Sequence, residues 1–256
     1  MPEGRRSGGP NPRRSERIWL IGASEGIGEA LARAYAARGD SLILSARTAE
    51  RLHALAETLP GTHDVLPLDI GDSQSMGQAQ LAMRAMGPVD RVINMAALYD
   101  PGQVEELDNQ RAADIVQVNL MGAFMVARTA LSVLRPAGQL ALCGSVAGYF
   151  GLPQGQIYSA TKAGVTNLAE SLRIELSGRF DVRLLSPGFV DTRLTQKNAF
   201  AMPGLMTPEN AAQAIVRGLD RRPFEVHFPR RLTLPLKLLR ILPYALAFPL
   251  TRRLLR

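Results

Sequence analysis

Apolar and polar positions follow two periods along the chain. From Ile18 onward, short apolar runs of strand length alternate with longer stretches that have the spacing of amphipathic helices. Seven strands separated by helices predict one α/β domain over residues 18–228, built as a Rossmann-type, doubly wound parallel sheet. In chain order the expected elements are strand Ile18–Ile21, helix Gly28–Arg38, strand Ser41–Ser45, helix Ala49–Leu59, strand Val65–Leu68, helix Ser73–Met86, strand Arg91–Asn94, helix Ala112–Leu134, strand Gln139–Cys143, helix Tyr158–Leu176, strand Val182–Leu185, helix Pro208–Leu219 and strand Phe224–Phe228.

The two ends of the chain lack this alternation. Residues 1–17 hold arginines, prolines and glycines but no apolar core of the kind a signal peptide needs, so we expect a flexible basic tail and a cytoplasmic protein. Residues 229–256 are rich in leucine, proline and arginine and predict a separate C-terminal extension. Its longest uncharged run, Ile241–Thr251, is interrupted by prolines and is shorter than the roughly 20 apolar residues that a spanning helix requires.

Charge is distributed unevenly along the chain. Residues 1–17 contain 5 basic residues (Lys and Arg) and 2 acidic residues (Asp and Glu). Residues 18–220 contain 16 basic and 20 acidic residues, and residues 221–256 contain 9 basic and 1 acidic. Because the central part is net acidic and poor in aromatic residues, a nucleic-acid partner is not expected. The single cysteine, Cys143, and three scattered histidines argue against a disulfide framework and against a metal site.

The basic, leucine-rich extension has two interpretations. Lys237 and Arg240 are spaced to share a helix face beside leucines, so residues 229–256 are able to lie on an anionic membrane surface at its cytoplasmic face. The same leucines are equally able to fold back over the subunit or over a partner. The sequence leaves both open.

A glycine-rich turn lies between the first predicted strand and the first predicted helix. Its sequence is Gly22-Ala23-Ser24-Glu25-Gly26-Ile27-Gly28. Glycines suit a tight turn that lets the backbone approach a pyrophosphate at a helix N-terminus. We therefore expect Gly22, Ser24, Gly26, Ile27 and Gly28 to contact a dinucleotide.

The end of the second predicted strand bears on which dinucleotide is bound. An NAD-binding unit usually has an acidic residue there to hold the ribose 2′-hydroxyl, whereas this strand ends in Ser45-Ala46-Arg47. An arginine beside an alanine favours a 2′-phosphate, so we expect NADP(H), with Arg47 as its ligand, in preference to NAD(H).

Tyr158 and Lys162 are four residues apart and share a face of the predicted helix Tyr158–Leu176. A nearby ammonium stabilises tyrosinate, so this pair is suited to general acid–base catalysis. Ser145 follows the strand Gln139–Cys143, at the edge of the sheet where α/β ligands bind, and its hydroxyl is able to hold a substrate oxygen.

With these motifs in this order, the chain resembles the short-chain dehydrogenases/reductases of the single-domain branch, over about Ile18 to Phe228. The resemblance rests on the glycine turn, Asn94-Met95-Ala96-Ala97, Asn119, Ser145, Tyr158 with Lys162, and Ser186-Pro187-Gly188 with Thr192. It differs from the usual family pattern at Ala97, where a glycine is common, and at Glu25, where NADP-preferring relatives often carry a basic residue.

The resemblance implies a role for each matched position. Tyr158 exchanges the proton, Ser145 polarises the substrate oxygen, and Lys162 binds the nicotinamide ribose and lowers the pKa of Tyr158. Asn119 completes the catalytic set by anchoring a water. The remaining cofactor contacts implied are Asp69 and Asn94 on the adenosine side and Pro187, Gly188, Val190 and Thr192 around the nicotinamide.

The loops expected around the substrate are apolar: Ala97–Tyr99, Val146–Phe150 and Phe189–Met206. They favour a hydride transfer between NADP(H) and the carbonyl or alcohol of an apolar, lipid-like substrate. We also expect the enzyme to be a homo-oligomer. The alternative is a nonenzymatic NADP-binding sensor or a membrane-attached adaptor. The intact Ser145, Tyr158 and Lys162 argue against that alternative.

Overall fold

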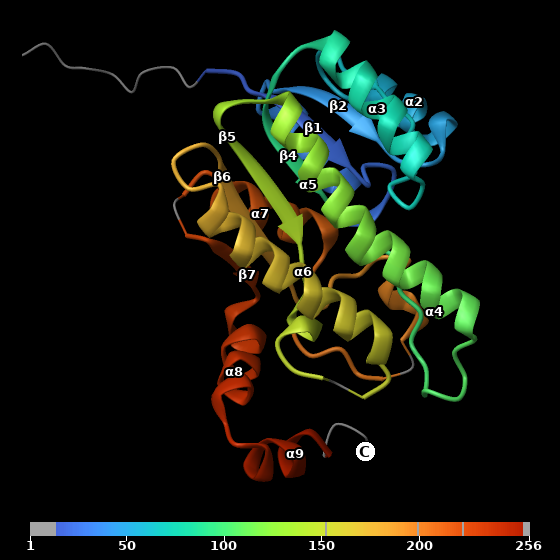
Figure 1. The fold of residues 1–256 in the computed structure, drawn as a ribbon, viewed down its shortest axis with the longest axis vertical. Helices are drawn as coiled ribbons and strands as arrows, with labels where there is room; N and C mark the ends of the chain where they lie inside the picture. The colour runs from blue at the N-terminus through green and yellow to red at the C-terminus, as the bar shows by residue number, and fades with distance from the viewer. Residues whose placement is uncertain (1–13, 152, 199, 222, 253–256) are drawn as a thin grey trace, which may run out of the picture.

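A single seven-stranded parallel sheet organises the chain, with strand order β3-β2-β1-β4-β5-β6-β7. The computed structural model describes residues 14–151, 153–198, 200–221 and 223–252, so most of the predicted basic N-terminal tail lies outside the described residues. Helices cover both faces of the sheet (Figure 1), which confirms the predicted doubly wound Rossmann-type fold.

All strands and helices of the predicted domain are present, several with shifted ends. The strands are β1 (Arg17–Ile21), β2 (Ser41–Ser45), β3 (Asp64–Val65), β4 (Val89–Asn94), β5 (Leu134–Cys143), β6 (Asp181–Pro187) and β7 (Glu225–Phe228). The helices are α1 (Gly26–Ala37), α2 (Ala49–Thr58), α3 (Ser73–Met86), α4 (Asn109–Val116), α5 (Gly122–Val133), α6 (Gln156–Glu175), α7 (Pro208–Leu219), α8 (Arg230–Ile241) and α9 (Tyr244–Arg252), with a short 3₁₀ turn η2 (Val146–Gly148) after β5 and another, η3 (Thr195–Lys197), after β6.

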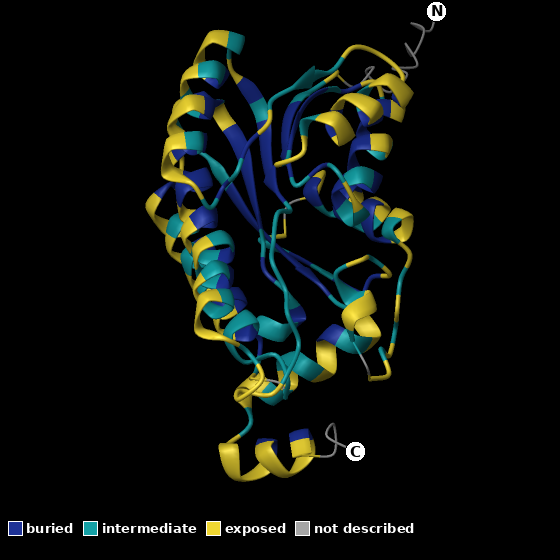
Figure 2. Cartoon of the chain, turned by 90° about the vertical axis from the view of Figure 1, so that its right-hand side faces the viewer, coloured by how far each residue is buried: buried dark blue, intermediate teal, exposed yellow. Residues whose placement is uncertain are grey.

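Two apolar cores lie on opposite faces of the sheet because successive strand residues point to opposite sides. In β1, Ile18 and Leu20 pack with α1, α2 and α7 in one core. Trp19 and Ile21 pack with α3, α5 and α6 in the other. The burial of both faces explains why the strands are nearly continuous apolar runs. Figure 2 shows the strands as buried and the outer helix faces as exposed.

Three element predictions need correction. The third strand was expected at Val65–Leu68 but covers only Asp64–Val65, although the N–H groups of Leu66 and Leu68 still donate to the carbonyls of Leu44 and Ala46, both at 2.9 Å. The long helix expected at Ala112–Leu134 is divided by a π-helical turn at Gln117–Met121. β5 begins at Leu134, directly after α5, rather than at Gln139.

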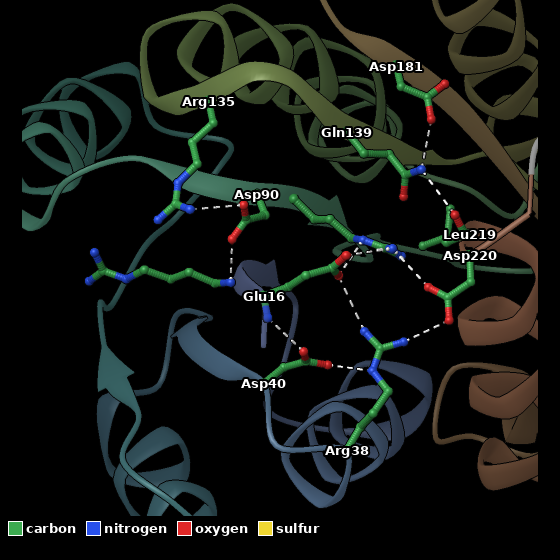
Figure 3. A network of polar contacts seen from close by, with 11 residues as sticks. Glu16, Arg38, Asp40, Asp90, Arg135, Gln139, Asp181, Leu219 and Asp220 are labelled. Atoms are coloured by element: carbon green, nitrogen blue, oxygen red, sulfur yellow. Dashed lines mark hydrogen bonds and ion pairs between the residues drawn. The ribbon is translucent and has the colours of Figure 1, made fainter. Parts of the chain in front are cut away.

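A network of ion pairs joins the amino ends of the strands (Figure 3). Glu16, just before β1, accepts from Arg91 of β4 at 2.8 Å and from Arg38 at 3.4 Å. Arg38 also binds Asp40 at 2.5 Å and Asp220 at 2.9 Å, and Asp220 in turn binds Arg91 at 2.8 Å. The Asp40 side chain is almost fully buried, so its charge depends on these partners.

The C-terminal extension forms two helices beyond the carboxyl end of the sheet (Figure 1). α8 is attached to the domain: Thr233 is fully buried, and its hydroxyl lies 2.6 Å from Nδ1 of His227 in β7. α9 projects from the domain and is largely exposed (Figure 2). Among the described residues, one helical stretch, Asn109–Val133, has the length and apolarity of a membrane span, but half of its apolar window is buried inside the fold.

Candidate active site

A cleft of about 590 Å³ opens at the carboxyl ends of the strands. It lies where the strand order reverses between β1 and β4, which is where ligands bind in sheets of this type. Most of the predicted site residues line it, from both halves of the sheet. They are Gly22, Ser24, Gly26, Ile27, Gly28, Arg47, Asp69, Ser145, Tyr158, Lys162, Pro187, Gly188, Val190 and Thr192.

The glycine turn is held where no larger residue fits. Gly22 has φ +81°, and a Cβ there would lie 2.6 Å from the backbone nitrogen of Ala96. A Cβ on Gly28 would lie 1.8 Å from the Gly22 carbonyl oxygen. This close packing leaves the start of α1 open toward the cleft, as a pyrophosphate site requires. The residues present therefore fit a dinucleotide.

Charged side chains gather where β2 ends. Arg47 is exposed, lines the cleft and has no ion pair within the described residues. Glu25, the acidic departure from the family pattern, binds Arg51 at 3.2 Å and Arg193 at 3.7 Å. Its negative charge is thereby countered by two arginines. This end of the cleft carries more positive than negative charge.

The adenine-side carboxylate, Asp69, is fixed by its own turn. Its Oδ1 accepts from the backbone N–H of Gly71 at 2.8 Å, while its backbone N–H donates to Ser75 Oγ at 3.0 Å. These bonds orient the side chain at the end of the third strand without closing the cleft, which Asp69 lines.

The three catalytic candidates come together from two elements. Ser145 begins the turn η2 after β5 and lines the cleft together with Tyr158. Tyr158 and Lys162 lie one turn apart on α6, with Lys162 Nζ 5.6 Å from the Tyr158 ring centre. Lys162 Nζ also donates to the backbone carbonyl of Cys143 at 2.8 Å, which fixes the ammonium beside the cleft.

Burial dominates the acid–base properties of this group. It raises the pKa of Tyr158 well above its usual range, while the nearby Ser145 hydroxyl acts in the opposite direction. Burial also lowers the pKa of Lys162. A phenol with a raised pKa keeps its proton at neutral pH and is suited to donate it to an oxygen that gains negative charge. The expected lowering of the Tyr158 pKa by Lys162 stays a prediction.

Two predicted residues lie behind the cleft rather than along it. Asn119, in the π-helical turn, accepts from the Leu98 N–H at 2.7 Å and donates to the Leu98 carbonyl at 2.8 Å. Asn94 is buried, and its Oδ1 accepts from the Ala96 N–H at 3.2 Å. Both asparagines thus hold the loop that follows β4. The water expected at Asn119 stays a prediction.

The loop after β4 also accommodates the alanine at position 97. Ala97 lines the cleft, and its φ is not positive, so a glycine is not required there. The departure from the usual glycine therefore leaves the turn intact.

Several cleft residues were not predicted. Arg51 could have been predicted from the sequence, since it lies four residues after Arg47, in the first part of α2. Arg193 gave no local signal, because its approach to Glu25 depends on the loop after β6. Leu232 of α8 packs directly on Gly188: a Cβ on that glycine would lie 2.8 Å from Leu232 Cδ2. α8 therefore supports the loop expected to hold the nicotinamide.

The loop between β6 and α7, which was expected beside the substrate, carries apolar side chains. The rings of Phe189 and Phe200 lie 5.9 Å apart, and the loop between β6 and α7 is closed by a bridge between Val190 and Met206. Within the described residues no group of three or more His, Cys, Asp and Glu side chains is arranged to hold a metal ion.

Comparison with known proteins gives consistent results. The family described as short chain dehydrogenase matches residues 16–202. An uncharacterized oxidoreductase of Myxococcus xanthus is 33% identical over 242 residues, 92% of this chain and 96% of that protein. 11-beta-hydroxysteroid dehydrogenase A of Arachis hypogaea is 32% identical over 194 residues, 73% of this chain but only 56% of that longer protein.

Solved structures share the fold. An alcohol dehydrogenase from Thermococcus sibiricus complexed with 5-hydroxy-NADP has a TM-score of 0.76 and 28% identity, covering 84% of this chain and 96% of that one. A short chain dehydrogenase/reductase from Burkholderia phymatum in complex with NAD has a TM-score of 0.79 at 22% identity, covering 88% of this chain and 92% of that one. Structures of this fold thus hold either NADP or NAD.

Proposed function

Because the chain belongs to the short-chain dehydrogenase family and is an oxidoreductase of that family, we propose that it transfers a hydride between NADP(H) and the carbonyl or alcohol of an apolar substrate. The observation that carries the proposal is that Ser145, Tyr158 and Lys162 line one cleft together with the glycine turn, with Lys162 Nζ 5.6 Å from the Tyr158 ring centre.

The chain's own residues supply binding and proton transfer, while the bound nicotinamide supplies the hydride. In the reducing direction Ser145 Oγ holds the substrate oxygen by a hydrogen bond, and the Tyr158 hydroxyl donates its proton to that oxygen. Lys162, held by the Cys143 carbonyl, presents its ammonium to the ribose and to the phenolate that remains. The oxidising direction reverses the proton transfer.

The preference for NADP(H) is supported by the charges at the end of β2. Arg47 has no carboxylate partner within the described residues and is exposed at the cleft. Since Arg51 and Arg193 counter the charge of Glu25, that carboxylate is not free to repel a 2′-phosphate. An arginine fork binds phosphate in two hydrogen bonds, which a ribose hydroxyl cannot match.

An apolar substrate is supported by the walls beyond Tyr158. The cleft lining includes the apolar residues Leu98, Val190 and Leu194, and the Tyr99 ring from the loop after β4 lies 4.7 Å from the Tyr158 ring. The named relative from Arachis hypogaea is a hydroxysteroid dehydrogenase, which agrees with a large apolar ketone or alcohol.

The direct test is NADPH oxidation by purified protein with methyl ketones of increasing chain length, repeated with NADH. We expect turnover that rises with chain length and a higher kcat/KM for NADPH. Binding of NADPH without turnover of any carbonyl or alcohol would contradict the proposed activity and would favour the nonenzymatic sensor. A preference for NADH would contradict the assignment of Arg47.

Peripheral attachment to the cytoplasmic face of an anionic membrane is part of the same proposal. On α9, Tyr244, Leu246 and Phe248 are 69%, 57% and 53% exposed, and the preceding Ile241 is 76% exposed. Exposed Arg240, on α8, lies next to this apolar surface in the chain. An amphipathic surface with basic residues gains both apolar burial and attraction to acidic lipid, about 1 kcal/mol per basic residue.

The two helices of the extension contribute unequally. Lys237, one of the basic residues of α8, binds Glu225 of β7 and lies 5.5 Å from the Tyr149 ring centre, so it faces the domain rather than a membrane. With Thr233 buried and Leu232 on Gly188, α8 is part of the enzyme. α9 is therefore the segment proposed to touch lipid.

Co-sedimentation with vesicles tests the attachment. We expect the full chain to pellet with phosphatidylserine-containing vesicles, less so at high salt and weakly with pure phosphatidylcholine. A chain ending at Leu242, which keeps α8, should stay in the supernatant and reduce a small water-soluble ketone as before. Vesicle binding that persists without α9, or dissociation of subunits on its removal, would contradict a membrane role.

The proposed enzyme is a homo-oligomer. Met121 and Phe124, at the junction of the π-helical turn and α5, are 44% and 43% exposed and offer an apolar face for a second subunit. Light scattering of the purified full chain measures this directly, and a monomeric mass would contradict it.

A further inference from the structure

Two loops that are distant in sequence meet beside the reacting phenol. The ring of Tyr99, from the loop after β4, stands edge-on to the Tyr158 ring with 4.7 Å between ring centres. The Tyr99 hydroxyl donates to Oδ1 of Asn198, in the loop after β6, at 2.6 Å. Asn198 in turn contacts the sulfur of Met202 at 3.4 Å. Tyr99 is thus held between the two loops.

An ion-pair clasp next to Tyr99 holds the same two loops together. Asp100 binds Lys197 at 3.0 Å and Arg111 at 2.8 Å. Lys197 Nζ also donates to the backbone carbonyl of Tyr99 at 3.1 Å. The hydrogen bonds from Arg111 and Lys197 hold the pKa of Asp100 below its usual value, so the clasp is charged at neutral pH.

Tyr99 does not behave as an ordinary core residue. It is only partly buried and belongs to neither of the two apolar cores. Its ring contact is with the catalytic phenol, and its hydroxyl is used to bind the facing loop. A ring fixed in this way limits space beside Tyr158 more strictly than a mobile loop side chain would.

We propose that Tyr99 is a specificity-determining residue, whose ring sets the size of the group that the substrate carries beside its reacting carbon. This rests on the proposed carbonyl chemistry, because a carbonyl oxygen bound to both Tyr158 and Ser145 puts one substituent of its carbon next to the Tyr99 ring. A small substituent fits beside the ring. A large one must displace it and break the bond to Asn198.

The proposal assigns substrate selectivity to the Tyr99 ring and not to its hydroxyl, so substitutions that remove one or the other test it. Tyr99→Ala removes the ring and opens space at the reacting carbon. Tyr99→Phe keeps the ring and loses only the hydrogen bond to Asn198. Tyr99→Leu, which fills part of the space, is a second size variant should the alanine variant not fold. Val104→Ala is the matched control, since Val104 lies in the same loop and is 75% exposed.

The experiment measures kcat/KM with NADPH for acetophenone, propiophenone and benzophenone, with thermal melting to confirm folding. Wild type and Val104→Ala should favour acetophenone. Tyr99→Ala should shift the benzophenone-to-acetophenone ratio by about tenfold or more toward benzophenone, with Tyr99→Leu shifted in the same direction and Tyr99→Phe close to wild type. The dissociation constant of NADPH should be the same in all variants.

The outcomes distinguish the inference from the proposed activity. If wild type reduces these ketones and the ratio is unchanged in Tyr99→Ala and in Tyr99→Leu, the assignment of Tyr99 is overturned while the activity stands. An equal shift in Val104→Ala also overturns the assignment. If wild type binds NADPH but reduces no carbonyl, the proposed activity fails and the inference fails with it.

Discussion

The two ends of the sheet use charge in opposite ways. At the amino ends of the strands, Glu16, Arg38, Asp40, Arg91 and Asp220 bind one another in a network of ion pairs (Figure 3). At the carboxyl ends, the cations that line the cleft include two with no ion pair in the described part of the chain. These are Arg47 and the buried Lys162.

The difference follows from the cost of burying charge. A buried charge needs a partner, and at the amino end the protein supplies it from neighbouring strands. At the carboxyl end Lys162 has only the Cys143 carbonyl, and the remaining positive charge is available to an anionic ligand. The paired charges at the amino ends of the strands thus stabilise the fold. The cations without an ion pair, Arg47 and Lys162, lie at the carboxyl ends, where the ligand is expected to bind.

The largest expected effect is at the carboxyl end. Tyr158→Phe removes the proton donor and little else, so we expect kcat to fall by about 10²- to 10⁴-fold, with the NADPH dissociation constant nearly unchanged. Steady-state kinetics and fluorescence titration measure the two quantities. Tyr35→Phe is the matched control. Tyr35 is buried beside Arg91 at the amino ends of the strands, so its substitution should leave kcat unchanged. Substantial residual activity in Tyr158→Phe would identify another acid.

Cofactor choice should reverse when the charge at β2 is reversed. In the double variant Ala46→Asp with Arg47→Ile, the phosphate loses its charge-assisted bonds, about 1.5–3 kcal/mol or roughly 10- to 100-fold in kcat/KM for NADPH. The new carboxylate accepts from the ribose hydroxyl of NADH. Kinetics with both cofactors check this. Arg33→Ala, an exposed arginine of α1 paired with Glu29, is the control and should change neither value.

Loss of an ion pair from the network at the amino ends of the strands should lower stability and leave catalysis unchanged. Arg38→Ala leaves the buried Asp40 carboxylate without its closest cation, and we expect a loss of about 3 kcal/mol in the free energy of unfolding. Urea unfolding at pH 7 measures it. The exposed pair lost in Arg33→Ala should cost less than about 0.5 kcal/mol. A large fall in kcat of the folded Arg38→Ala protein would contradict the division between the two ends.

The smallest effect expected is on pH dependence. Burial alone would raise the pKa of Asp181, but hydrogen bonds from Arg183, Gln139 and Arg173 outweigh it and lower that pKa. The unfolded state then binds the proton more readily, so this stabilisation is complete above the unfolded value of about 3.9 and is lost as pH falls toward the folded one. Unfolding between pH 3 and pH 7 should show a flatter profile in Asp181→Asn than in wild type, with activity at pH 7 unchanged.

Much of the fold was predictable because its signals are local. α3 and α7 were predicted with their observed bounds, since Asp72 and Thr207 cap their first turns from within the same segment. The glycine turn and the Tyr158–Lys162 pair were equally local. β3 was predicted too long because its apolar run continues past Val65, and the sequence does not show where regular pairing with β2 ends.

Features that depend on distant segments were not predicted. The clasp between Asp100 and Lys197 joins residues 97 positions apart, and Arg38 and Asp220 are 182 apart. The pairing of Glu25 with Arg193 and the packing of Leu232 on Gly188 arise only when the sheet has assembled. Neither the hydrophobic period nor a motif within one segment predicts contacts between segments that are far apart in the sequence.

The contact between Leu232 and Gly188 has a consequence for biogenesis. The loop of Gly188 leaves the ribosome before α8 has been made, so the nascent chain first presents that loop without its support. Docking of α8 then completes the wall of the cleft after β6 has joined the sheet. Cofactor capture is accordingly a late event in the synthesis of each chain, because the wall of the nucleotide site is complete only after Leu232 has docked on Gly188.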